Sequence, residues 1–533
     1  MNDEQDHVDA PETNPWAVLV GVAAGMLMAV LGIGIVNIAL PTIADDMNAS
    51  LPNVQWVLIA YLLSMTGLVP IFGRISDVLG RKRLFVGGIL IVAGASVLAA
   101  LAPTITWLIA ARAIQGVGGA LIMANTYAIV TDIFPEDTRG TAMGVLVIMI
   151  SGGAALGPSV GGFLATNFGW QAVFLLNVPL ALIAATVAAI LLPPLKSNRT
   201  REPVDVVGAV LLFGGLTPLL LGVTQVDAWG LTSTRVVSLV AGGLVVMASF
   251  FAWERRMTYP LVDLSLFRIR PFGMGLLAAM VTTLTMGSMM LLLPFYWQGL
   301  RGFSAQDAGL LMLPLPGLLM ITAPLAGRAT DRWGARRIAT MGLVVMFVGL
   351  ASLSQISAEM PIWNVLWRVM LLGMGIGMFM APNNNAIMSA APEHRRGIAS
   401  GLLGTFRYTG QSTGVAFSGM LFAVYATAQG FSLNELPGRE RLLEVQGDPA
   451  ALEAYQAAFM NGMEGVLLTA LPVVATAAVL SFLRGAPPPT TVELEEFGSE
   501  ARPVVAGGGN GHREQDDEDG EEEAARQRER PGA

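Results

Sequence analysis

Few side chains of this 533-residue sequence are suited to covalent or metal chemistry. Cysteine is absent, which excludes disulfides, thiolate metal sites and cysteine nucleophiles. Of the three histidines, His7 and His512 lie in the tails and His394 lies in a loop. No metal-ligand cluster or nucleophile–base set stands out, so the sequence is a poor fit to an enzyme. We expect no metal and no cofactor.

The cations that could do chemistry lie inside long apolar runs. Arg112, Arg368 and Arg407 are such residues. A buried membrane cation is costly and is normally paired or functional. The alternative interpretation is a structural hydrogen bond to carbonyls of a neighbouring helix. Arg368 can also extend its charge to the membrane surface.

Acidic residues are absent from the centres of these runs and lie near their ends, at Asp132, Asp227, Glu254 and Glu464. A carboxylate that carries protons needs partial burial, which raises its pKa toward the working pH. Asp132 and Glu464 are the best candidates for this role. The alternative for both is a solvated helix end.

Composition indicates an integral membrane protein. Hydrophobic residues make up 53% of the chain and charged residues 13%, whereas a soluble domain has roughly 25% charged residues. The net charge of −8 comes mainly from acidic residues in the two tails. It therefore gives no indication of a nucleic-acid partner, and the lipid bilayer is the expected environment.

Apolar runs of the length that crosses a bilayer recur along the chain. A spanning helix needs roughly 20 mostly apolar residues. We predict fourteen spans, near residues 16–38, 53–73, 84–102, 105–130, 141–165, 170–192, 206–226, 233–253, 273–297, 306–327, 337–355, 362–386, 398–426 and 462–483. The predicted fold class is therefore an all-α membrane protein.

The distribution of basic residues predicts the orientation. Loops after even-numbered spans hold most of the Arg and Lys residues, whereas loops after odd-numbered spans hold only Arg235, Arg301, Arg439 and Arg441. Basic loops favour the cytoplasm. Both termini are therefore expected to be cytoplasmic.

An internal repeat divides the chain. The segment Gly73–Arg83 returns as Gly327–Arg337, and Gly153 and Gly157 return as Gly410 and Gly414, 254 to 257 residues later. Two homologous six-helix halves are a recurring transporter plan. We expect a tail at 1–15, halves at 16–192 and 273–484, two extra central helices within 193–272, and an acidic disordered tail at 485–533. Residues 427–461 should form an external loop in which Ala450–Ala458 is an amphipathic helix.

Two segments have features of moving parts. The Gly73–Arg83 loop combines glycines, which allow tight turns at helix ends, with Asp77, which can lie near a helix N-terminus or accept from arginine. The fifth span carries Gly153, Gly157, Pro158 and Gly161 at a spacing that lets a neighbouring helix approach closely. Ordinary close packing is the alternative for this span.

The Gly73–Arg83 loop and its repeat resemble the signature loop of the major facilitator superfamily, and the two extra helices resemble its fourteen-helix drug/proton antiporter branch. Further matches run over residues 16–484: Trp56 with Tyr61-Leu62-Leu63, Arg112 with Gln115-Gly116, Phe134-Pro135 with Arg139-Gly140, Gly157-Pro158 with Gly161-Gly162, and Trp170 with Phe174 and Asn177-Val178-Pro179.

The resemblance implies a multidrug efflux protein of the cell membrane that exports amphipathic small molecules, driven by a proton gradient, and we expect it to be a monomer. It implies that Gly73, Arg74, Asp77, Gly80 and Arg81, with Asp331 in the repeat, form a conformational switch. A basic topology anchor is the alternative for this loop. The glycine motif implies export. Two alternative functions are export of an endogenous lipid, metabolite or anion, and a membrane sensor on the same fold.

The first span departs from the family pattern. Relatives usually carry an acid a few residues before an Asn–Val/Ile–Ala–Leu–Pro run, and Gly32 stands at that place here. We expect Gly32 and Arg112 to lie at similar depth, so that Arg112 lacks a carboxylate partner. Proton coupling through a first-span carboxylate is excluded.

The expected substrate cavity is apolar with a few polar groups. Its candidate residues are Asn37, Met286, Met290, Tyr296 and Trp297. Methionine adapts to irregular ligands, although it is also common on lipid-facing surfaces.

Overall fold

The computed structural model describes residues 14–193, 205–258, 260–262, 264–391, 396–427, 442–443, 445 and 447–485. Within these residues all regular secondary structure is helical. The composition explains this, because an apolar segment in lipid must satisfy its own backbone hydrogen bonds and an α-helix does so internally. The residues up to Pro487 form one compact unit.

The first part of the chain forms six spanning segments, two of which are broken into two helices. Their bounds are α1 Pro15–Asp46, α2 Leu51–Val54 with α3 Trp56–Leu79, α4 Arg81–Ala100, α5 Ile105–Ile133, α6 Glu136–Phe168, and α7 Trp170–Leu175 with α8 Asn177–Leu191. A helical hairpin follows, made of α9 Val206–Thr224, the short α10 Val226–Trp229 and α11 Thr234–Glu254.

The last part of the chain repeats the first. After the short η1 Leu264–Arg268 come α12 Arg270–Phe295 with η2 Tyr296–Leu300, α13 Ala305–Met312 with α14 Pro314–Trp333, α15 Ala335–Leu353, α16 Ile362–Ala390, α17 Arg396–Thr427 and α19 Pro449–Leu483. The pairing of α1 with α6 is matched by that of α12 with α17.

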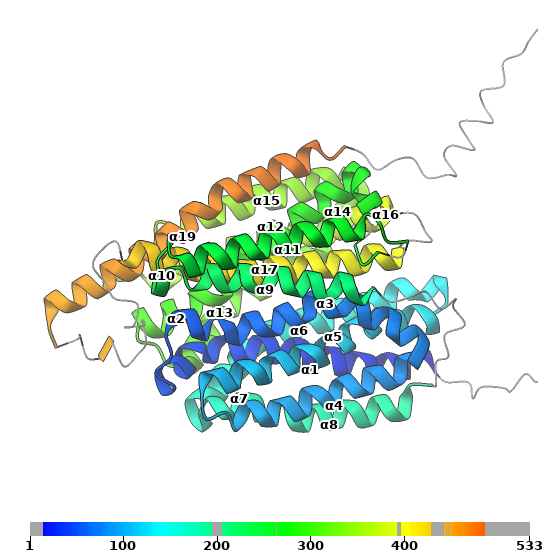
Figure 1. Ribbon diagram of the computed structural model, residues 1–533, viewed down its shortest axis with the longest axis horizontal. Coiled ribbons are helices and arrows are strands. Elements are labelled where there is room, and N and C mark those ends of the chain that lie inside the picture. The colour runs from blue at the N-terminus through cyan, green and yellow to red at the C-terminus, as the bar shows by residue number, and fades with distance from the viewer. Residues whose placement is uncertain are drawn as a thin grey trace, which may run out of the picture. The chain divides into compact units, whose positions relative to one another are not determined.

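The fourteen predicted spans are all present as helices. Twelve helical segments of the described chain are long and apolar enough to cross a membrane. The remaining two predicted spans correspond to α6 and α17, which are 33 and 32 residues long. The spanning helices run roughly side by side along the long direction of Figure 1.

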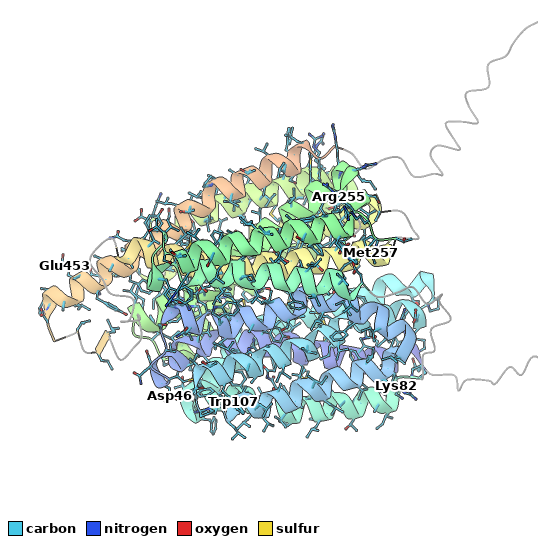
Figure 2. All side chains as sticks on the ribbon, in the orientation of Figure 1. Asp46, Lys82, Trp107, Arg255, Met257 and Glu453 are labelled. Carbon is cyan, nitrogen blue, oxygen red and sulfur yellow. The ribbon has the colours of Figure 1, made fainter. Side chains whose placement is uncertain are left out.

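The even number of spans places both ends of the described chain on one side of the bundle. We call this the termini side, where α1 begins and α19 ends, and we call the opposite side the far side. Figure 2 shows Lys82, Arg255 and Met257 toward one end of the bundle and Asp46, Trp107 and Glu453 toward the other.

The surface of the bundle matches a lipid environment. Tryptophans near helix ends are exposed, among them Trp16, Trp107, Trp333 and Trp363. Tryptophan favours membrane–water interfaces, where its ring meets both lipid and water. Aliphatic side chains are exposed between these levels, for example on α8 and α11.

Glycine makes the turn between α3 and α4. Gly80 has φ of +96°, and its repeat counterpart Gly334, between α14 and α15, has φ of +80°. This left-handed conformation strains residues that carry a Cβ. Gly73, also expected at a turn, instead lies inside α3 with no atom within 4 Å of where its Cβ would stand.

Residues 450–458 are helical, as expected, and lead into the last span, because α19 continues without a break from Pro449 to Leu483. Asp448 caps this long helix by accepting from the backbone N–H of Ala450. Most of the expected external loop before Pro449, and the expected tails at residues 1–13 and from 486 onward, lie outside the described residues.

Candidate functional site at the seam between the two halves

The glycines of α6 bring its backbone against α1. A Cβ on Gly157 would stand 2.7 Å from the Cα of Gly34, and one on Gly161 would stand 2.6 Å from the carbonyl oxygen of Ile35. Real Cβ atoms do not approach this closely, so both positions require glycine. Gly153 is less crowded, at 3.2 Å from Leu27.

The same helix contacts the other half of the molecule. Gly162 packs on the backbone of Ala305, and Gly309 packs on that of Pro158. The Ser159 hydroxyl donates to the Gly309 carbonyl at 3.3 Å. These contacts join α6 to α13 near the far side, so one glycine-rich face serves both packing within a half and contact between halves.

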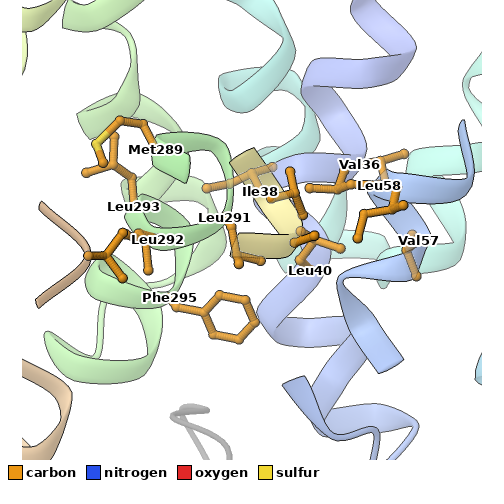
Figure 3. Close-up of a cluster of buried hydrophobic side chains, with 14 of the residues drawn as sticks. Val36, Ile38, Leu40, Val57, Leu58, Met289, Leu291, Leu292, Leu293 and Phe295 are labelled. Atoms are coloured by element: carbon orange, nitrogen blue, oxygen red, sulfur yellow. The ribbon is translucent and has the colours of Figure 1, made fainter. Parts of the chain in front are cut away.

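Further hydrogen bonds close the far side, one from η2 to α1 and one from α13 to α6. The Gln298 amide donates to the Ile38 carbonyl at 2.8 Å, and the Gln306 N–H donates to Thr166 at 3.0 Å. Figure 3 shows aliphatic side chains of α1 and α3 in one buried cluster with Leu291 and Phe295 of α12. In this structure the two halves are therefore sealed together on the far side.

Arg112 is buried on α5 without a carboxylate partner among the described residues; its side chain is 1% exposed. Its Nε donates to the Val57 carbonyl at 2.9 Å, and its Nη1 donates to the Gln115 amide oxygen at 2.7 Å. The guanidinium also lies over the Tyr61 ring, 4.4 Å from the centroid. Carbonyl and π-electron density thus replace the carboxylate.

Tyr61 links Arg112 to the contact surface between the two halves. It packs in a cluster with Leu62, Met65 and Ala120, against which Tyr408 of α17 is placed from the other half. Tyr408 in turn lies within electrostatic range of Arg407 and Tyr127. A half-buried cation and three phenol rings therefore gather where α3, α5 and α17 meet.

The buried Arg112 cluster and the helical repeat can both be compared with known protein families. The sequence profile of the Major Facilitator Superfamily matches residues 22–415. The chain belongs to the major facilitator superfamily. Its members are transporters, and the chain has the multi-pass helical fold of that family.

Curated relatives in the family cover most of the chain. It is 31% identical over 410 residues to the tetracenomycin C resistance and export protein of Streptomyces glaucescens, covering 77% of this chain and 76% of that one. It is 30% identical over 408 residues to the riboflavin transporter RibZ of Clostridioides difficile, covering 76% and 88%.

A solved structure shows the same fold. It is a bacterial homologue of the human lysosomal transporter Spinster, in an inward-facing and unoccupied conformation. The TM-score is 0.62 at 15% identity, with 88% of this chain and 96% of that chain covered.

The Gly73–Arg83 segment of this superfamily member is tied to α5 by an ion pair. Arg81, at the start of α4, is paired with Asp132 near the end of α5 and also donates to the Ala128 carbonyl at 2.8 Å. Asp132 is thus an anchor for the loop on the termini side. The side chains of Arg74, Asp77 and Asp331 lie outside the description. The backbone of Asp77 is in the last turn of α3, which is a helix C-terminus, so of the two expected roles only acceptance from arginine stays a prediction.

Replacing Asp132 by asparagine is expected to lower the thermal stability of the purified protein by a few degrees. The buried Arg81 loses a charged partner, which costs about 2 kcal/mol, and transport should fall as the loop loosens. Glu464→Gln is the matched control. A melting curve and transport rate for Asp132→Asn equal to those of the wild type would contradict this role.

Glu464 lies away from the seam. Its side chain is exposed on α19, so the partial burial expected of a proton-carrying carboxylate is absent. At Gly32, where relatives carry an acid, the atoms nearest to the Cβ position belong to Asn177 of α8, at 3.4 Å.

The candidate cavity residues lie in three different environments. Tyr296 and Trp297 are fully buried in η2, where their rings pack at 5.0 Å, so in this structure they support the far-side seal and line no open cavity. Met286 and Met290 are half-buried, and Gln411 of α17 donates to the Met290 sulfur at 3.1 Å. Asn37 is buried, and its amide oxygen has no partner among the described residues.

Sequence reasoning missed Tyr127 and Tyr408 as site residues. The sequence feature that could have identified them is a tyrosine inside an apolar span. Tyr408 also follows Arg407 directly. Only the fold shows that both rings lie at the same seam as Tyr61.

Proposed function

We propose that this transporter exports amphipathic small molecules from the cell in exchange for protons, by alternating access. The observation that carries the proposal is the α6 contact surface. It holds α6 on α1 through Gly157 and Gly161 and meets α13 of the other half through Pro158 and Gly162. The far-side seal consists of backbone contacts, a few hydrogen bonds and the apolar cluster of Figure 3, and alternating access requires all three to separate.

The direction of transport is inferred from the basic residues and the relatives. Lys82, Arg255, Arg336 and Arg484 lie on the termini side, which supports cytoplasmic termini by the positive-inside rule. The far side, sealed in this structure, then faces outward. A relative whose name includes resistance and export supports efflux across the cell membrane.

The side chains at the contact between the two halves support an amphipathic substrate. Arg407 offers a cation, and Tyr61, Tyr127 and Tyr408 offer aromatic faces with a polar tip. Rings of this kind bind apolar and aromatic surface without fixing one ligand geometry. A small molecule with a ring system and a polar or anionic group fits this chemistry.

Two further assignments complete the proposal. The Gly73–Arg83 loop acts as the switch, because it is anchored to α5 by Arg81 and Asp132 and turns at Gly80. The protein works as a monomer in the bilayer and needs no cofactor, since the proton gradient supplies the energy.

The test is dye uptake into inverted membrane vesicles that contain the protein. With an inward-acidic gradient, wild-type vesicles should concentrate an amphipathic dye, and a protonophore should abolish this. Vesicles with Gly161→Val are the inactive control. Equal dye movement with and without the gradient would refute antiport, and no movement of any dye tested would favour a sensor.

A further inference from the structure

Two carboxyl groups are buried together where the extra hairpin meets the termini side. Asp205 precedes α9 and Glu254 ends α11, and each is only 3% exposed. They lie at adjacent ends of antiparallel helices, well outside the cluster formed by Tyr61 and Tyr408. Burial of two acids without a cation is costly, so their arrangement calls for an explanation.

Each carboxyl uses one oxygen to accept hydrogen bonds. The Oδ1 of Asp205 accepts from the N–H of Gly208 at 2.7 Å and from the indole of Trp253 at 3.0 Å. The Oε2 of Glu254 accepts from the N–H of Val262 at 3.1 Å. These donors fix the orientation of both groups.

The other two oxygens face one another. The Oδ2 of Asp205 and the Oε1 of Glu254 are the two atoms nearest to the Cβ position of Gly208, the second of them at 2.7 Å, so the two carboxyl groups lie side by side at that point. No N–H or O–H of the described residues reaches either oxygen. A hydrogen bond between two carboxyl groups requires that one of them carries a proton.

Within the described residues no cationic side chain neutralises the pair; Lys196, Arg199 and Arg201, which precede Asp205, lie outside them. The charged residues on neighbouring elements are Arg255 and Arg256 after α11, Arg268 on η1, Arg270 on α12 and Arg407 on α17. Among the described residues none of these arginines forms an ion pair with Asp205 or Glu254. Arg74 and Asp77 of α3 have side chains outside the description.

We propose that Asp205 and Glu254 form a proton-binding site, in which one proton is shared between Oδ2 and Oε1. Two carboxylates at this separation cannot both stay ionised in a buried site, because their repulsion is not screened by water. Glu254 also lines a cavity of about 680 Å³ with Arg255, Pro260 and Phe267. This cavity gives the proton a path from the termini side.

The proton would hold the extra hairpin to the C-terminal half. Glu254 binds the backbone of Val262, and the segment that follows places Phe267 5.6 Å from Phe406 on α17. Loss of the proton leaves two negative charges next to one another. Their repulsion weakens the packing of the end of α11 against this segment. The site does not depend on the proposed export function, so failure of either proposal leaves the other standing.

The experiment compares purified full-length wild type with Glu254→Gln and Asp205→Asn by infrared difference spectroscopy in D₂O. The wild type should show the C=O stretch of a protonated carboxyl at neutral pH that disappears as the pH rises. Both variants should lose this band. Asp46→Asn is the matched control, because Asp46 also accepts from an indole, that of Trp170 at 2.7 Å, but faces no second carboxyl in the described residues.

A second measurement covers the case in which a variant is poorly folded. Glutamine at 254 can donate to Asp205 and so imitates the shared proton. The melting temperature of the wild type should therefore fall by several degrees between about pH 6 and pH 9 relative to Glu254→Gln. A wild-type spectrum without the band at neutral pH, or a band that survives both substitutions, overturns the proposal. So does a band that sodium or calcium ions remove at constant pH, since that result indicates a cation site.

Discussion

Replacing Gly161 by valine is expected to abolish transport. The new Cβ would stand 2.6 Å from the carbonyl oxygen of Ile35 and 2.7 Å from its Cα, and backbone atoms cannot move aside as a flexible side chain can. Overpacking of this kind costs up to about 3 kcal/mol. Because α6 also carries the contact with α13, a displaced helix would lose the far-side seal as well. The measurement is gradient-driven transport in liposomes, together with the melting temperature in detergent.

The matched control lies on the same helix. Gly152 has no atom within 4 Å of its Cβ position, so Gly152→Val introduces the same side chain without a clash. It should insert, melt and transport close to the wild type. Equal activity of Gly161→Val and Gly152→Val would show that close approach of α6 to α1 is unnecessary.

Replacing Arg112 by alanine is expected to lower transport at least ten-fold with little loss of stability. The substitution removes hydrogen bonds to Val57 and Gln115, which costs about 1–3 kcal/mol for each group left unpaired. It also removes a buried charge that lacks a carboxylate partner in the described residues, whose desolvation costs several kcal/mol. These two effects oppose each other in folding, whereas transport loses the guanidinium that stacks on Tyr61 beside Tyr408.

Lysine is expected to substitute poorly at this position. Arg112→Lys keeps the charge but cannot reach Val57 and Gln115 together, and it lacks the planar group that stacks on Tyr61. Arg235→Ala is the control, since Arg235 lies 5.7 Å from the Trp229 ring on the exposed surface. Wild-type transport by Arg112→Ala would contradict a functional role for this residue.

Much of the fold could be predicted because hydrophobicity and repetition are strong signals in a membrane chain. A run of roughly 20 apolar residues has few structural choices in lipid, and the recurrence of Gly80 as Gly334 places the same turn in both parts. The helix at residues 450–458 was predicted separately from the spanning run because it is less apolar, and packing of the buried Tyr455 and Phe459 joins the two in α19.

The site was harder to predict because its contacts join residues far apart in the chain. Nothing local to Asp132 indicates that it pairs with Arg81, and nothing local to Glu254 indicates that it faces Asp205 across Gly208. Nothing local to Gly32 indicates that its nearest side chain is Asn177 of α8. Sequence patterns predict which residues are costly to bury, but the packing of helices decides which partners they have.

We expect the far-side seal to open in each transport cycle. The natural absence of cysteine allows a pair to be introduced at Thr166 and Gln306, where the Gln306 N–H donates to Thr166 across the halves at 3.0 Å. A pair at Tyr425 and Thr469, whose hydroxyls are 3.5 Å apart between α17 and α19, is the control for cross-linking within one half. Joining Thr166→Cys to Gln306→Cys with a short thiol cross-linker should stop transport in liposomes, and a reducible linker should restore it on cleavage. Undiminished transport with this cross-link complete would contradict the account.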